Sequence, residues 1–219
     1  MSRRVALVRV SELTGEQWGM VTAGQAAAAG VSAVDMGRLV ADGLLEAVPD
    51  AARVYRLAGS PEDPDLDGVR AAWLQLGGAR RWHERIQGMD AVASHRTAAH
   101  VHDLGDLIPA AHEFDVTRRR QPRRRDLRLH LRTHLSPEEW TTSDGLPVTT
   151  IARIITDLLA DVEDESGIAG ICHDAAARGL LATADLSRLV TPFTRRYEAD
   201  SPEHLAERLL APETTAVNQ

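Results

Sequence analysis

One short segment does most to set how this sequence can fold. Residues 59–67 read Gly-Ser-Pro-Glu-Asp-Pro-Asp-Leu-Asp, with two prolines, four acids and one large hydrophobic residue. Such a run supplies no core side chains, and proline interrupts helices and sheets, so the segment is typical of a connection between domains. The 219 residues are therefore expected to form a domain over 1–58, an acidic linker over 59–67 and a larger domain over 68–212, with a tail over 213–219.

Two helix starts lie close together in the first part. Thr22 and Ser32 are each followed, three positions later, by a residue whose side chain can accept a backbone hydrogen bond. This spacing is typical of capped helix N-termini. A glycine follows each apolar run, so the pattern predicts helices over 23–29 and 33–42, joined by a turn at residues 30–31. Two helices in this arrangement have the outline of a helix-turn-helix.

Strand-like runs follow the second of these helices. Residues 44–48 and 53–57 are rich in apolar residues and enclose a turn that begins at Pro49. Residues 5–18 are expected to supply a further helix ahead of the helix-turn-helix. Three helices followed by a hairpin are the layout of a winged helix, so we expect residues 1–58 to form a winged helix-turn-helix DNA-binding domain.

The helix over 33–42 is expected to present one face to DNA. Met36, Leu39 and Val40 are spaced to face the core. The opposite face carries the residues expected at the groove, which are Ser32, Ala33, Asp35 and Arg38. Arg38 is suited to two hydrogen bonds with guanine. Contacts to phosphate or to the minor groove are expected from Arg53 in the wing turn and from Arg3 and Arg4 in a flexible N-terminal arm.

The second part mixes helices and strands. Apolar residues cluster or alternate over 91–93, 112–117 and 126–132, which predicts strands. The residues of the last two strands that are expected to face inward are Phe114, Val116, Leu127, Leu129 and Leu131. Helices are expected over about 69–76, 94–103, 151–159, 166–178, 184–190 and 202–210. The expected fold class is α+β, with an N-terminal winged helix-turn-helix domain followed by a larger mixed α/β domain.

Positive charge is concentrated in one stretch of the second part. The chain has 25 basic residues, all of them arginine, and a net charge of −7. Between residues 118 and 132 there is one acid, Asp126, and there are eight arginines: Arg118, Arg119, Arg120, Arg123, Arg124, Arg125, Arg128 and Arg132. Residues 118–125 are interpreted as a hairpin between two strands. They form either a solvated surface or a basic patch for an anionic partner, nucleic acid or an acidic protein face.

The residue types present exclude several kinds of chemistry. Without lysine, the chain has no Schiff-base lysine and no phosphate-binding loop of the Walker type. The single cysteine, Cys172, excludes a disulfide framework within the chain. The histidines between residues 95 and 102 lack a cysteine or an acid at a known ligand spacing. We therefore expect no metal, no cofactor and no enzymatic activity.

The distribution of apolar residues bears on the cellular compartment in which the protein is expected. No apolar run approaches the length of a membrane span, and Arg9 interrupts the apolar residues near the N-terminus. A soluble, cytoplasmic protein without membrane contact is the expectation.

Short motifs in both parts make the chain resemble a known family. They are Gly19-Met-Val-Thr22, Gly30-Val-Ser32, Leu39-Val-Ala-Asp-Gly43, Val54-Tyr-Arg-Leu57, Ala93-Ser-His-Arg-Thr-Ala-Ala99, and Gly145-Leu-Pro-Val-Thr-Thr-Ile-Ala-Arg153 with Asp157 beyond it. Over about residues 18–190 the sequence resembles the AbiEi-type antitoxins, which are the antitoxin half of type IV toxin–antitoxin and abortive-infection pairs. It also resembles the winged-helix regulators of actinobacteria that share this two-part layout.

The resemblance implies a function for each part. In that family the N-terminal module binds the operator of its own operon, and the second domain counteracts a nucleotidyltransferase toxin, often without a stable complex. The expected partners are double-stranded operator DNA and a cognate toxin, with the chain acting as a monomer or as a homodimer on DNA. The resemblance also implies a shared functional surface formed by Ser94, His95, Arg96, Thr150, Arg153 and Asp157.

Two other functions remain open. The chain is alternatively a stand-alone winged-helix transcriptional regulator, whose larger domain senses a ligand or dimerises. An enzyme acting on nucleic acid is disfavoured by the missing lysine and by the lack of a clustered carboxylate motif.

The charge of the first part departs from the family pattern. Recognition helices in the family are often basic, whereas residues 1–58 hold six arginines and six acids. Because basic groups that neutralise phosphates supply most of the affinity for DNA, the arginine-rich stretch or a second copy of the chain is expected to add the missing charge.

Overall fold

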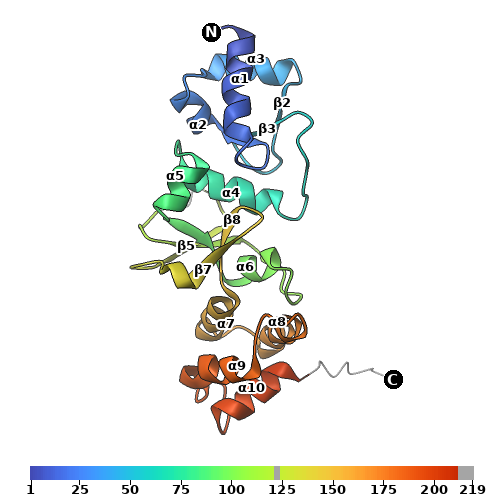
Figure 1. Ribbon diagram of the computed structural model, residues 1–219, viewed down its shortest axis with the longest axis vertical. Helices are drawn as coiled ribbons and strands as arrows, with labels where there is room; N and C mark the ends of the chain where they lie inside the picture. The colour runs from blue at the N-terminus through green and yellow to red at the C-terminus, as the bar shows by residue number, and fades with distance from the viewer. Residues whose placement is uncertain (121–123, 212–219) are drawn as a thin grey trace, which may run out of the picture. The chain divides into compact units, whose positions relative to one another are not determined.

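A computed structural model describes residues 1–120 and 124–211 of the chain. These residues form a mixed α/β fold with ten α-helices and two sheets (Figure 1). The expected tail over 213–219 lies outside them. None of the helices they form combines the length and the apolarity needed to cross a membrane.

Contacts between residues divide the chain into two compact units, Met1–Ala91 and a second unit that begins at Val92. The division therefore falls well after the acidic segment at 59–67, where the sequence placed the linker. The helices that follow this segment group with the first unit.

The first unit opens with six elements in the order α1 (Arg3–Thr14), β1 (Met20–Thr22), α2 (Ala23–Ala28), α3 (Ala33–Ala41), β2 (Leu45–Ala47) and β3 (Val54–Leu57). The strands form an antiparallel sheet in the order β1-β3-β2. Both predicted helix caps are confirmed. Thr22 and Gln25 form a capping box at the start of α2, and the Ser32 hydroxyl accepts a hydrogen bond from the backbone N–H of Asp35.

The core of these elements gathers the apolar faces of the helices against the sheet. Its buried members are Ala6, Val10, Leu13, Val21, Ala26, Val31, Met36, Leu39 and Leu45. Two predictions were wrong here. Val40, expected inside, is 37% exposed. Arg3 and Arg4 lie in the first turn of α1 rather than in a flexible arm, because Ser2 caps the helix by accepting from the Val5 backbone N–H.

Two further helices, α4 (Asp67–Gly77) and α5 (Trp82–Gln87), complete the first unit through polar contacts. The guanidinium of Arg56, on β3, lies 2.5 Å from the carboxylate of Asp67. Arg70, on α4, pairs with Asp63 at 2.9 Å. The acids of the segment at 59–67 thus neutralise two buried arginines, which ties that segment to the first unit.

The second sheet has five strands in the order β6-β5-β4-β8-β7. They are β4 (Ala91–Ala93), β5 (His112–Val116), β6 (Leu127–Leu131), β7 (Trp140–Ser143) and β8 (Leu146–Thr149). β4 and β8 are parallel, whereas β7 and β8 are antiparallel. β5 and β6 are parallel and in register, with His112 opposite Leu127 and Val116 opposite Leu131.

The parallel pairing of β5 and β6 corrects the hairpin interpretation of residues 118–125. A hairpin would make the two strands antiparallel, so the connection instead returns the chain to the start of β5 before β6 begins. Alternation of apolar residues reports which face of a strand is buried but not the direction of the strand. Leu131, expected inside, is 60% exposed at the end of this edge strand.

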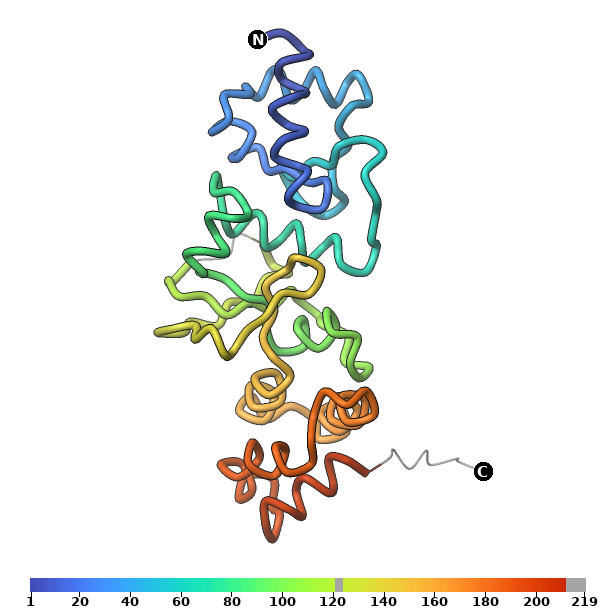
Figure 2. The backbone as a smooth tube through the Cα atoms, in the orientation of Figure 1, coloured from blue at the N-terminus to red at the C-terminus, as the bar shows by residue number. Residues whose placement is uncertain are grey.

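The remaining helices are α6 (His95–Val101), α7 (Ile151–Ala160), α8 (Glu165–Ala177), α9 (Thr183–Val190) and α10 (Pro202–Leu210). α6 contacts β5, β8 and α7, and α10 packs against α8 and α9, as the trace in Figure 2 shows. Thr150 caps α7 by accepting from the Arg153 backbone N–H, and the stripe of Ile154, Ile155, Leu158 and Leu159 is buried. These placements confirm the predicted helices.

Candidate functional site

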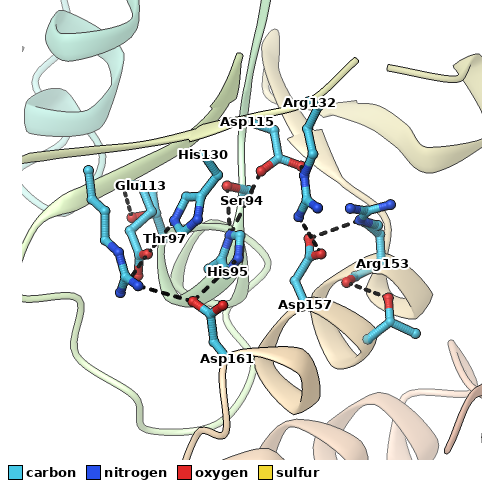
Figure 3. Close-up of polar contacts among 12 residues, drawn as sticks. Ser94, His95, Thr97, Glu113, Asp115, His130, Arg132, Arg153, Asp157 and Asp161 are labelled. Atoms are coloured by element: carbon cyan, nitrogen blue, oxygen red, sulfur yellow. Dashed lines mark hydrogen bonds and ion pairs between the residues drawn. The ribbon is translucent and has the colours of Figure 1, made fainter. Parts of the chain in front are cut away.

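Charged and polar side chains from four elements of the second unit meet in one network (Figure 3). Ser94 and His95 stand at the start of α6, and Glu113 and Asp115 lie on β5. The other contributors lie on or beside β6 and α7, and they are Arg128, His130, Arg132, Arg153, Asp157 and Asp161. Segments far apart in the sequence therefore form a single site.

His95 lies at the centre of this network. Its Nδ1 atom is hydrogen-bonded to the Ser94 hydroxyl at 2.9 Å. Its ring stacks on the His130 ring, with centroids 3.6 Å apart and planes inclined by 12°. Its Nε2 atom lies 3.8 Å from a carboxylate oxygen of Asp161. The backbone of His95 has φ = 53°, a left-handed conformation that is uncommon for a residue other than glycine.

Burial keeps His95 in its neutral form. The pKa of the imidazole is lowered from 6.5 to about 4, mainly by removal from water and then by the nearby His130 ring. The carboxylates of Glu113 and Asp161 oppose this shift. At neutral pH, His95 therefore contributes an uncharged ring that can both donate and accept a hydrogen bond.

Each buried acid of the network is matched by a base. Glu113 accepts a hydrogen bond from His130 Nε2 at 2.9 Å. Asp115 pairs with Arg132 at 3.0 Å. Asp157 lies between two arginines, 2.5 Å from Arg132 and 2.9 Å from Arg153. Such matching is what a low-dielectric interior requires, because an unpaired buried charge is costly.

Asp115 is the most deeply placed of the acids, at 1% exposed. Burial raises the pKa of its carboxyl, and the neighbouring charge of Asp157 raises it further. The Arg132 guanidinium acts in the opposite direction by stabilising the carboxylate.

A pocket of about 180 Å³ opens beside the network. Its polar lining consists of His95, Arg96, Glu113, Arg128, Asp161 and Glu163. Arg96 holds Glu163 with two hydrogen bonds of 2.5 and 2.7 Å, and Arg128 lies 3.1 Å from Asp161. With acids and arginines interleaved, the pocket is suited to a small polar molecule rather than to a polyanion.

Two groups of three side chains have the composition of a metal site. In His95, His130 and Asp161, and in His95, Asp115 and Asp157, one possible ligand atom per residue lies within 4.8 Å of the others. Arginines already bind all three of these carboxylates. The stacked imidazole planes also direct their lone pairs side by side rather than toward a common point. The geometry therefore favours an ion-pair network over metal coordination.

The structure brings together most of the surface that the family resemblance implied. Ser94, His95, Arg153 and Asp157 belong to the network, whereas Arg96 lines the adjoining pocket. Thr150 lies at its edge as the cap of α7.

Sequence reasoning missed most of the acidic side of the site, which comprises Glu113, Asp115, Asp161 and Glu163. One signal could have found two of them. In the parallel register, Glu113 stands opposite Arg128 and Asp115 stands opposite His130, so each acidic residue faces an arginine or a histidine along β5 and β6. This complementarity is visible only once the strands are aligned in parallel.

The predicted basic patch divides into two groups. Arg118, Arg119 and Arg125 are exposed and Arg120 is half-buried, while Arg123 lies outside the described residues. The other three are engaged by acids: Arg124 pairs with Asp126, Arg128 with Glu113 and Asp161, and Arg132 with Asp115 and Asp157. Arg128 on β6 and Arg132 just after it thus belong to the network around His95.

The residues predicted to contact DNA lie in the first unit. Ser32, Ala33 and Arg38 are exposed along α3, and Arg53 is exposed in the turn before β3. Arg4 is exposed on α1, and Arg3, also exposed, pairs with Asp42 at 2.9 Å.

Asp35 is a correction to this set, because it does not face outward. It is 7% exposed, and its carboxylate accepts a hydrogen bond from the Ser32 hydroxyl at 2.7 Å. The carboxylate also lies 3.3 Å from Arg38.

Comparison with known proteins shows what the fold is similar to. No family model matches the sequence, and no curated protein matches it. The chain is similar to the crystal structure of the RV2827C protein from Mycobacterium tuberculosis, with a TM-score of 0.51 and 16% identity, over 94% of this chain and 80% of that chain. At this level of identity the similarity shows a shared fold alone.

Proposed function

We propose that this chain is a cytoplasmic DNA-binding antitoxin. Its first unit would repress its own operon through a winged helix-turn-helix, and its second unit would counteract a nucleotidyltransferase toxin without catalytic activity of its own. The order of elements in the first unit carries the proposal. Helix, strand, two helices and a β-hairpin follow one another in α1, β1, α2, α3, β2 and β3, and the sheet order is β1-β3-β2. This order of elements supports a winged helix in the first unit.

In this proposal, α3 is the recognition helix. Its exposed face carries Ser32, Ala33, Val34 and Arg38, while Met36 and Leu39 hold the helix to the core. A helix fixed on one side and exposed on the other can enter the major groove of DNA. Arg38 would donate two hydrogen bonds to guanine, and Arg53 in the wing turn would contact phosphate.

The antitoxin assignment rests on the family resemblance together with the placement of its motifs. The motif at 93–99 and the motif at 145–153 are separated by more than forty residues in the sequence. Their polar side chains nevertheless belong to one network around His95. A largely buried network shared by two motifs is consistent with a common function.

DNA binding is tested by a gel shift with the DNA upstream of the chain's own coding sequence. We expect Arg38→Ala to lower affinity by about 5- to 150-fold, the range for loss of a two-bond contact to guanine. Arg188→Ala removes another exposed arginine, from α9, and should leave binding unchanged. A wild-type protein that binds a random duplex as well as the upstream DNA would contradict the proposal.

The basic patch gives a second prediction. Simultaneous replacement of Arg118, Arg119 and Arg125 by glutamate should weaken DNA binding and make its loss with salt shallower, if these exposed side chains supply the charge that the first unit lacks. The measurement is affinity at several salt concentrations, alongside growth on co-expression with the toxin. Unchanged DNA binding together with unchanged growth would exclude a role for the patch.

Toxin neutralisation is tested by co-expression with a nucleotidyltransferase encoded beside this gene. The proposal predicts that growth is restored, and continued growth arrest would contradict it. Asp157→Asn, which removes one charge from the network, should weaken neutralisation but leave DNA binding by the first unit unchanged.

One observation favours the alternative of a stand-alone regulator. The pocket of about 180 Å³ beside His95 is large enough for a small polar ligand, as expected if the second unit senses a molecule. A chromosomal neighbourhood without a nucleotidyltransferase, combined with specific binding to the upstream DNA, would support this alternative.

A further inference from the structure

Segments from three parts of the first unit are joined at the start of α2. The backbone N–H of Ala23 donates to the carbonyl of Arg53, in the turn before β3, at 2.9 Å. The side-chain amide of Gln25 donates to the carbonyl of Arg80, in the connection between α4 and α5, at 2.9 Å. The wing turn and the α4–α5 connection are therefore both fixed to the first turn of the same helix.

Other contacts hold the same arrangement. The Thr22 hydroxyl donates to the carbonyl of Gly78 at 3.0 Å, and the Gln75 amide donates to the carbonyl of Ala52 at 2.7 Å. The connection between α4 and α5 thus cannot move away from the wing turn without breaking hydrogen bonds. Sequence reasoning had assigned this connection to the other domain.

Exposed arginines stand on these segments. Arg53 and Arg81 are exposed, and Arg80 is 42% exposed while it pairs with Asp90. Asp90 is itself buried and shared with Arg85, so its charge is already matched within the fold.

Acids stand near these arginines as well. Asp50 lies in the wing turn, and the carboxylate of Glu84 accepts from the backbone N–H of Arg81 at 2.9 Å. Asp50 and Glu84 are both exposed. An arginine side chain is long and carries its donors on the guanidinium at its end. Each arginine can therefore contact a phosphate directly, although Asp50 and Glu84 lie in the same segments.

We propose that Arg81, together with Arg53 and Arg80, forms a phosphate-binding surface that completes the DNA interface. This inference rests on the proposed DNA-binding function. In helix-turn-helix proteins the first helix of the motif crosses the DNA backbone while the second enters the groove. In this chain α2 corresponds to that first helix. The three arginines are held beside its start, so they are placed to contact the DNA backbone. Contacts from this surface to phosphate would not distinguish one DNA sequence from another, but they would position α3 on the DNA.

The test measures how the affinity of the full chain for its upstream DNA changes with salt. Each phosphate contact contributes about 0.9 to the slope of log affinity against log salt. Arg81→Gln removes one such contact, so it should reduce the magnitude of the slope by about 0.9. The factor by which affinity falls between about 50 and 200 mM salt should therefore be about 3.5-fold smaller than in the wild type. Arg81→Lys, which keeps the charge, should retain the wild-type slope, because a point charge suffices at a phosphate.

Arg188→Gln is the matched control, because it removes the same charge from an exposed site on α9. An Arg81→Gln protein with the wild-type slope would overturn the inference, as would an equal effect of Arg188→Gln. A wild-type protein with no preference for the upstream DNA would refute the proposed function itself, and the inference with it. A normal wild-type preference with an unchanged Arg81→Gln slope refutes the inference alone.

Discussion

Arg85→Ala is expected to destabilise the first unit by about 3–5 kcal/mol, the cost of breaking a buried ion pair by removing one partner. Arg85 is fully buried on α5, and its guanidinium lies 3.5 Å from the centre of the Trp73 ring. It donates to the Trp73 carbonyl and approaches Asp90 at 3.3 Å. Truncation would leave a cavity, a carbonyl without this donor and a buried carboxylate that has lost one of its arginine partners.

Chemical denaturation followed by tryptophan emission measures this effect. Of the four tryptophans, Trp18, Trp73 and Trp82 lie in the first unit. Replacing Trp140 by phenylalanine in all proteins compared confines the signal to that unit. Arg81→Ala is the control, because this exposed arginine stands just before the same helix and its loss should change stability by less than about 0.5 kcal/mol. A loss below about 1 kcal/mol for Arg85→Ala would show that the buried arginine is not required for stability.

Local signals in the sequence were sufficient for most of the helices. Hydrogen bonds at a helix start depend on residues three positions apart, so Thr22, Ser32 and Thr150 could be assigned as caps without knowledge of the fold. The apolar stripe of α7 was equally visible, since its period of about 3.6 residues is set by the helix itself.

Interactions between distant segments were not predictable in the same way. The acid next to Arg85 in the sequence, Glu84, is exposed, whereas its buried partner Asp90 lies five positions further on. The burial of Arg85 also depends on Gly77, where a Cβ atom would lie 2.6 Å from the Arg85 side chain. Such a position appears exposed in a sequence pattern, because arginine is mostly a surface residue.

The acidic side of the candidate site was missed for a related reason. Glu113 and Asp115 alternate with Phe114 and Val116, which is the pattern of a strand with one face in water. Glu113, Phe114, Asp115 and Val116 are all buried instead, so both faces of β5 are covered, and α6 packs against the strand. The direction of β6 decided which charges meet, and a ten-residue connection leaves that direction open.

The pH dependence of stability tests the burial of His95. The folded-state pKa of about 4 lies below the ordinary value of 6.5. Between these values the unfolded chain binds a proton that the folded protein does not, so stability falls as the pH decreases through this window. The full difference corresponds to about 3 kcal/mol, reached near pH 4.

Asp115 makes a contribution of opposite sign above the ordinary pKa of its carboxyl. Its raised pKa means that the folded protein binds a proton before the unfolded chain does, which stabilises the fold as the pH decreases. The unfolding free energy of the whole protein therefore changes less with pH than the titration of His95 alone would predict. The contribution of His95 is isolated by comparing the wild type with a variant that lacks only this titrating ring.

His95→Asn is the suitable variant, because asparagine tolerates the positive φ of this position better than other non-glycine residues do. Loss of the ring stacking with His130 shifts stability by an amount that does not depend on the ionisation of residue 95. The difference in unfolding free energy between the two proteins should therefore narrow by up to about 3 kcal/mol as the pH is lowered from about 7 to about 4. Denaturation curves at several pH values measure it. Parallel profiles would mean that His95 titrates normally, so that its ring is not buried in the network.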